Sequence, residues 1–160
     1  MRRAPVHVMT WVVAWLVFAS LACGTGSRRG SMPLGALAPW AMHILEAPTE
    51  IERIIFETRA IVTFDPIASV RGHDIVARVP VAVTTWSTSV FDQGWRGVPS
   101  FPENSPVADR AIRVRRGEAE LLIIGNHSGE FVEIDGGLDR IVLVVTPVEF
   151  RSWWASAEWR

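Results

Sequence analysis

The feature that most constrains the fold is an alternation of apolar and polar side chains with a period of two. In the stretch 52–64 the even positions from Ile54 to Phe64 carry apolar or small residues, and the odd positions include Arg53 and Glu57. The stretch 75–86 repeats the pattern, although Pro80 lacks a backbone N–H and places this strand at a sheet edge or a bulge. Such alternation is typical of strands with one face on the core. It predicts two long strands in the first half of the chain.

A hairpin is predicted where two alternating runs meet at Arg116-Gly117. Taking these two residues as the turn fixes which side chains face each other across the strands. The predicted pairs are Arg115 with Glu118, Arg113 with Glu120, Val114 with Ala119 and Ile112 with Leu121. This register collects opposite charges on one face and apolar side chains on the other, as paired strands require.

A second hairpin is predicted with Gly136-Gly137 as its turn. The predicted pairs are Glu133 with Arg140, Phe131 with Val142 and Val132 with Ile141. A connector over residues 125–129 would join the two hairpins into a four-stranded meander that ends in the apolar run 141–145.

These patterns together predict an all-β fold of about six or seven strands with little helix. We expect an antiparallel β-sandwich, with a partly closed β-barrel as the alternative. Short helical turns are expected near each end, one over residues 39–47 and one over 152–160 that Ser152 would cap. The tryptophans of the second turn should pack over an open end of the sandwich. The predicted domain spans residues 39–160.

The N-terminal segment has the pattern of a secretory leader. Arg2 and Arg3 precede an apolar run over residues 8–18, and small residues follow up to Cys23. We therefore expect a signal peptide over residues 1–22. A lone cysteine directly after such a run resembles the bacterial lipoprotein precursors, in which the cysteine is acylated and becomes the new N-terminus. The resemblance covers the leader alone, and it implies lipid attachment at Cys23 with the membrane as a partner.

Two other outcomes remain open for the leader. Ser20 and Leu21 stand in the reverse of the usual lipoprotein order, and Ser20-Leu21-Ala22 also fits ordinary cleavage, which would release a secreted protein. An uncleaved leader would instead anchor the chain in the membrane. All three outcomes place the mature chain outside the cytosol, in the cell envelope or secreted. Residues 23–38 are rich in glycine and show no periodicity, so they predict a flexible tether.

The composition excludes several classes of function. Every basic residue is Arg, so the chain has no lysine for a phosphate-binding loop, a Schiff base or a Ser-x-x-Lys pair. The single cysteine, Cys23, rules out an internal disulfide and a multi-cysteine metal site. The formal net charge of -1 provides no attraction for nucleic acid. We expect no cofactor and no bound metal ion.

Carboxylates and histidines are the remaining candidates for chemistry. The predicted registers place Glu118, Glu120 and Glu133 opposite arginines, which favours an ion-paired exposed face over a glycosidase-like pair of acids. His73 and His127 lie in predicted turns. A hydrolase would require one of these histidines to meet a serine or an acid from another segment.

The stretch 92–109 is the candidate ligand-binding segment, because it is long, contains several prolines and has no strand pattern. Its Trp95, Arg96 and Phe101 would form an exposed platform for a sugar ring or an extended peptide. The structural alternative is that Trp95 and Phe101 fold inward and cap the sandwich. Separately, the triplet Asn126-His127-Ser128 matches the acceptor pattern for N-glycosylation.

The sequence therefore predicts a non-enzymatic cell-envelope protein. In this interpretation a small β-sandwich, held at the membrane through a lipid on Cys23, acts as a binding or structural module for an envelope protein or a glycan. Two alternatives remain open: a secreted carbohydrate- or peptide-binding module that uses residues 92–109, and a secreted hydrolase with a histidine-based site.

Overall fold

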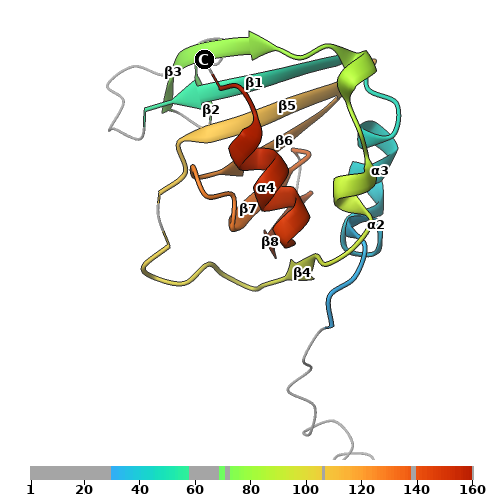
Figure 1. Ribbon diagram of the computed structural model, residues 1–160, viewed down its shortest axis with the longest axis vertical. Coiled ribbons are helices and arrows are strands. Elements are labelled where there is room, and N and C mark those ends of the chain that lie inside the picture. The colour runs from blue at the N-terminus through green and yellow to red at the C-terminus, as the bar shows by residue number, and fades with distance from the viewer. Residues whose placement is uncertain (1–29, 58–68, 71–72, 106, 138–139, 160) are drawn as a thin grey trace, which may run out of the picture.

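The computed structural model describes residues 30–57, 69–70, 73–105, 107–137 and 140–159 (Figure 1). The predicted leader, Cys23 and the second half of the first predicted strand lie outside these residues. Eight strands form one sheet: β1 Glu50–Phe56, β2 Ser69–Val70, β3 His73–Pro80, β4 Arg96–Gly97, β5 Arg110–Arg116, β6 Ala119–Gly125, β7 Phe131–Asp135 and β8 Ile141–Val145. Their order is β2-β3-β1-β5-β6-β7-β8-β4, and all neighbours are antiparallel.

The antiparallel all-β class that the sequence predicts is confirmed, including the meander of β5 to β8. The sheet is open, with β2 and β4 at its two edges, so it is not a closed barrel. One face of the sheet, the core face, is covered by helices and a long connection (Figure 1). This layer takes the place of the second sheet of a sandwich. These helices are α2 Leu34–Leu37, α3 Pro39–Leu45 and α4 Val148–Ser156.

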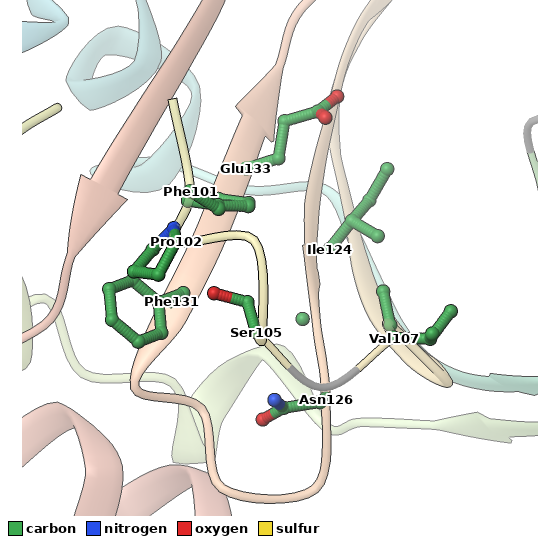
Figure 2. A pocket seen from close by; sticks show the side chains of 10 residues that line it. Phe101, Pro102, Ser105, Val107, Ile124, Asn126, Phe131 and Glu133 are labelled. Atoms are coloured by element: carbon green, nitrogen blue, oxygen red, sulfur yellow. The ribbon is translucent and has the colours of Figure 1, made fainter. Parts of the chain in front are cut away.

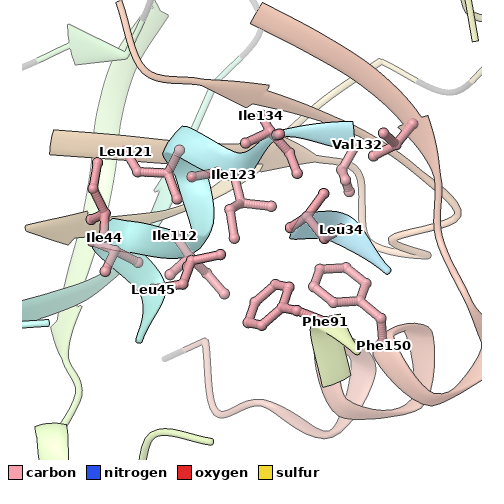
Figure 3. Close-up of a cluster of buried hydrophobic side chains, with 14 of the residues drawn as sticks. Leu34, Ile44, Leu45, Phe91, Ile112, Leu121, Ile123, Val132, Ile134 and Phe150 are labelled. Atoms are coloured by element: carbon pink, nitrogen blue, oxygen red, sulfur yellow. The ribbon is translucent and has the colours of Figure 1, made fainter. Parts of the chain in front are cut away.

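The main core lies between the sheet and these helices (Figure 3). Its buried side chains include Leu34, Ile44, Leu45, Phe91, Ile112, Leu121, Ile123, Val132, Ile134 and Phe150. Each large apolar side chain removed from water in this way stabilises the fold by about 1.5–3 kcal/mol.

A smaller buried cluster, with Ile54, Phe56 and Ile124 among its members, lies apart from the main core. We call the sheet face that carries Ile124 and Glu133 the outer face.

The β5–β6 hairpin keeps the predicted faces but not the predicted partners. The observed pairs are Arg116 with Ala119, Arg115 with Glu120, Val114 with Leu121 and Arg113 with Leu122. The turn is therefore Gly117-Glu118, where Gly117 has a positive φ of 59° that favours glycine. The predicted register is wrong by two residues. Because a shift of two leaves every side chain on its face, the separation of charged and apolar residues is unchanged.

The β7–β8 hairpin differs more from its prediction. The observed pairs are Phe131 with Val145, Val132 with Val144, Glu133 with Leu143 and Ile134 with Val142. The predicted pairing of Glu133 with Arg140 is wrong by three residues, and an odd shift moves each side chain of β8 to the opposite face. Two causes account for the error. The connection is longer than a two-residue turn, since Asp135 pairs with Ile141, and the run 141–145 is apolar at every position.

Two long connections cross the sheet because β3 and β4 lie toward opposite edges of it while β5 lies near its middle. The strand predicted over 75–86 ends at Pro80, and the chain from residue 81 to residue 95 crosses the core face, where Phe91 is buried. The chain then crosses the outer face between β4 and β5, with Phe101 packed on Phe131. We call the described part of this second connection, residues 98–105 and 107–109, the outer crossing segment.

The folded region begins before the expected domain boundary at residue 39. Met32 forms two backbone hydrogen bonds with Trp95, at 2.8 and 2.9 Å. Leu34 and Ala38 are fully buried in the main core. Residues 32–38 therefore belong to the domain and not to a flexible tether, because their apolar side chains are needed to cover the core beside β4.

The C-terminal helix α4 begins at Val148, directly after Pro147, and not at Ser152 as expected. Its tryptophans pack inward. Trp154 is fully buried, and its indole N–H donates to the carbonyl of Asn126 at 2.8 Å. The indole N–H of Trp159 donates to the carbonyl of Trp154 at 3.0 Å. The polar atom of each indole therefore has a partner where its ring is buried.

Two arginines hold the residues that follow α4. Arg53 donates from Nη1 to the carbonyl oxygen of Glu158 at 3.0 Å, and the Arg110 guanidinium lies 5.2 Å from the ring centre of Trp159. Burial lowers the pKa of Arg53, and the Glu158 carboxylate partly offsets this effect. The C-terminal residues are thus attached to β1 and β5.

Candidate functional site

Trp95 does not contribute to an exposed platform. Its side chain is fully buried, with the ring stacked on Phe91 at 5.7 Å and meeting Phe150 edge-on at 4.9 Å between ring centres. Its indole N–H donates to the carbonyl of Val90 at 3.2 Å. The alternative in which Trp95 folds inward is therefore the one observed, and this residue belongs to the core.

Arg96 and Phe101 are separated from Trp95 by the path of the chain. Arg96 is exposed on β4, at the edge of the sheet. Phe101 lies half-buried on the outer face, where its ring centre is 5.7 Å from that of Phe131. Because the chain passes from the core face to the outer face between Trp95 and Phe101, the three residues do not form one surface.

The outer crossing segment instead encloses a cavity against β6 and β7 (Figure 2). The cavity has a volume of about 270 Å³. It is lined by Phe101, Pro102, Ser105, Val107, Ala108, Ile124, Gly125, Asn126, Phe131 and Glu133. In Figure 2, Phe101 and Phe131 lie on one side, Val107 and Ile124 on the other, and Ser105 between them.

Most of the cavity wall is apolar. Ile124 is almost completely buried and belongs to the small cluster near the outer face, against which Ala108 also packs. Val107 is 70% exposed and lies at the rim. Small-molecule sites commonly combine such apolar walls with a few polar groups that set orientation.

Three polar side chains, Ser105, Asn126 and Glu133, complete the wall. The Ser105 hydroxyl is shielded from water and has no hydrogen-bond partner among the residues that the structure describes. The Oε1 atom of Glu133 is likewise shielded from water. Buried polar groups are normally hydrogen-bonded, so a shielded hydroxyl in a cavity wall marks a place where a ligand would gain an interaction.

Asn126 has a structural task that explains its burial. It is 2% exposed, and its Oδ1 accepts hydrogen bonds from the backbone N–H groups of Ser128 at 2.9 Å and Gly129 at 3.1 Å. The Ser128 hydroxyl donates to the same oxygen at 2.7 Å. Asn126 therefore shapes the β6–β7 turn, and its side chain is inaccessible to glycosylation in the folded protein.

The predicted ion-paired face exists, and the predicted contact of Arg113 with Glu120 is one of its ion pairs. Glu120 contacts Arg115 at 2.8 Å and Arg113 at 3.5 Å. Arg115 also contacts Glu50 at 3.1 Å, and the chain of ion pairs continues from Arg113 to Glu52 at 3.2 Å. Hydrogen bonds to Glu120 and then to Glu50 raise the pKa of Arg115. These carboxylates are held by arginines on neighbouring strands, which agrees with a structural role.

Glu118 and Glu133 do not follow the predicted pattern. Glu118 lies in the β5–β6 turn, and Glu133 faces Leu143 across the strands while lining the cavity. The error in the β8 register explains why the sequence placed Glu133 opposite Arg140 and missed its position in the cavity wall.

The two candidate histidines are not brought together. His73 stacks on Phe56, with 5.8 Å between ring centres. His73 begins β3, and His127 follows the end of β6. β3 and β6 are three positions apart in the sheet, which corresponds to about 14 Å. Among the described residues no cluster of three or more His, Cys, Asp or Glu side chains has the geometry for a metal ion.

Searches with this chain find no matching family model, curated protein or solved structure. Within the described part of the chain, no helix has both the length and the apolar character needed to cross a membrane.

The sequence identified the segment but not most of the site. Phe101 belongs to both the predicted platform and the observed cavity. Ser105 and Val107 lie in the same predicted loop, yet no motif marks them. Ile124 and Phe131 come from strands, and only the path of the outer crossing segment over β6 and β7 brings them opposite that loop.

Proposed function

We propose that this protein is a non-enzymatic binding module of the cell envelope, and that it binds a compact, mainly apolar ligand in the cavity under the outer crossing segment. The observation that carries the proposal is the cavity of about 270 Å³ with apolar walls and a shielded Ser105 hydroxyl. Binding is favoured because the apolar surface of a ligand would leave water without any rearrangement of the main core.

Binding is a better interpretation of this cavity than catalysis. Among the residues that the structure describes, its polar side chains are one serine, one asparagine and one glutamate, and no histidine lines it. A serine nucleophile requires a base within hydrogen-bond reach, and the Ser105 hydroxyl has no hydrogen-bond partner among the described residues. The side-chain Oδ1 of Asn126 already accepts three hydrogen bonds.

The envelope location is supported by the leader pattern and by the resemblance of its Cys23 to that of lipoprotein precursors. The packed region begins at Met32, so only residues 24–31 separate Cys23 from the domain. Eight residues extend over at most about 28 Å. An acyl group on Cys23 would therefore hold the cavity close to the membrane surface.

Ligand binding is tested with toluene as the probe, by measuring the unfolding temperature Tm with and without it. A ligand at ten times its Kd stabilises the native state by about 1.4 kcal/mol, so we expect an increase of several degrees in Tm. The variant Ala108→Phe, which fills the cavity, should lose this response. Val148→Phe, at an exposed position on α4, is the matched control and should retain it.

An equal response to toluene in the parent, Ala108→Phe and Val148→Phe would show that the effect does not arise in the cavity and would overturn the binding proposal. If Ala108→Phe does not fold, Val107→Phe at the rim provides the second filled variant. The envelope proposal has its own test: the mass of the protein extracted from host membranes, compared with Cys23→Ser. We expect acyl mass on a chain that starts at Cys23, and recovery of an unacylated protein from the cytosolic fraction would overturn it.

A further inference from the structure

The size of the cavity limits the ligand to about one ring. A closed apolar cavity of about 150 Å³ holds benzene, and sites for drug-sized ligands begin near 300 Å³. The present cavity, at about 270 Å³, lies between these values. A single six-membered ring with one or two small substituents therefore fits inside it, whereas most of an oligosaccharide or a folded peptide segment would lie outside it.

The walls favour an aromatic or aliphatic ring over a sugar. Phe101 and Phe131 are packed against each other at an interplanar angle of 57°, so they do not present one flat open platform for a sugar ring. Ile124, Val107 and Ala108 provide the remaining apolar contacts. A sugar would bury several hydroxyl groups here, and each one without a partner would weaken binding.

The polar groups of the wall select one substituent on that ring. The Ser105 hydroxyl can donate one hydrogen bond and accept others, and it is unpartnered among the described residues. Glu133 contributes a carboxylate, which accepts hydrogen bonds from more than one donor at once and disfavours an anionic ligand. A hydroxyl group complements the serine, and it carries no negative charge that Glu133 would repel.

We infer that the cavity binds a compact ring that carries a single neutral hydroxyl group, of the phenol class, with Ser105 as its hydrogen-bond partner. The inference rests on the proposed binding function and names the ligand class for the same cavity. A neutral hydroxyl is favoured over an ammonium group because a full charge loses far more hydration on entering apolar walls.

The experiment compares the Kd values of three matched probes, namely toluene, 4-methylphenol and 4-methylbenzylamine, for the parent protein and for Ser105→Ala. In the parent we expect 4-methylphenol to bind about fivefold more tightly than toluene, as one additional buried hydrogen bond provides. In Ser105→Ala the two affinities should become equal, while the toluene affinity stays unchanged. Ser156→Ala, in which the altered hydroxyl belongs to α4, is the control and should keep the parent ratio.

Each alternative outcome has a distinct meaning. Equal binding of toluene and 4-methylphenol by the parent overturns the hydroxyl inference and leaves the binding proposal intact. Tightest binding of the amine overturns it in favour of a cationic ligand that Glu133 attracts. A preference for 4-methylphenol that survives in Ser105→Ala removes Ser105 from the site. Absence of binding by all three probes overturns the proposed function itself.

Discussion

The two faces of the sheet are built differently: one carries the main core, and the other carries the cavity for which we propose ligand binding. On the core face, Trp95 and Trp154 are fully buried, and both indole N–H groups have carbonyl partners. On the outer face, the Ser105 hydroxyl is shielded from water and lacks a partner among the described residues. The core face therefore holds tightly packed indoles whose N–H groups are paired, while the outer face keeps a cavity beside a shielded hydroxyl.

The largest effect is expected from truncation on the core face. Trp154→Ala removes a fully buried ring that contacts Phe150 and Trp159. It also leaves the Asn126 carbonyl without the indole donor. We expect the free energy of unfolding to fall by about 4 kcal/mol in a urea titration. Trp153→Ala, at a half-buried position of the same helix, should cost clearly less, and equal losses for both variants would contradict the described packing.

A smaller loss is expected where a glycine permits close packing on the core side. A Cβ atom at Gly136 would lie 2.5 Å from the ring of Trp40. Gly136→Ala should therefore lower the free energy of unfolding by about 2 kcal/mol. Gly137→Ala is the control, because its φ of 69° is strained for alanine while its surroundings are open. It should cost about 1 kcal/mol, and a larger loss for Gly137→Ala than for Gly136→Ala would argue against the Trp40 contact.

On the outer face a substitution in the cavity wall is expected to stabilise the protein. Ser105→Ala removes a shielded hydroxyl that has no partner among the described residues. We expect the free energy of unfolding to rise by about 1 kcal/mol, since a buried unsatisfied polar group is destabilising. Thermal unfolding of the parent and of Ser105→Ala measures this directly. A loss of stability would mean that the hydroxyl makes an interaction in solution and would weaken the contrast between the two faces.

The smallest effect is expected for the ion pairs of the outer face. Glu120→Gln removes the carboxylate that Arg113 and Arg115 share. The side chain of Glu120 is 38% exposed, so solvent screens these pairs. We expect a loss of about 0.5 kcal/mol in low salt and a smaller one in 1 M salt. A loss that does not change with salt would indicate a packing role for Glu120.

The sequence predictions are more accurate for segments in which charged and apolar residues alternate. In the β5–β6 hairpin, charges and apolar residues alternate, so the faces are correct although the register is displaced by two residues. In the β7–β8 hairpin, the uniformly apolar run 141–145 carries no alternation, and the predicted face of β8 is wrong. Alternation thus identifies the faces of a strand, while the partner also depends on the length of the connection.

For the candidate site, too, the sequence identified the segment but not the arrangement of its residues. The sequence singled out the segment 92–109, because its prolines and its lack of periodicity distinguish it from the strands. It placed Trp95 and Phe101 on one surface, whereas they lie on opposite faces of the sheet. No local pattern encodes which face a crossing connection takes, since that depends on strand order.

The sequence by itself determined the strand content, the antiparallel class, the absence of lysine chemistry and the leader pattern that ends at Cys23. These properties follow from residue types and from periodicity along the chain. Tertiary structure alone decided the order of the strands, the burial of Trp95 and the meeting of Ser105, Ile124 and Glu133 around one cavity. The reason is physical: long-range packing brings distant segments together, and the cost of closing a loop depends only weakly on its length.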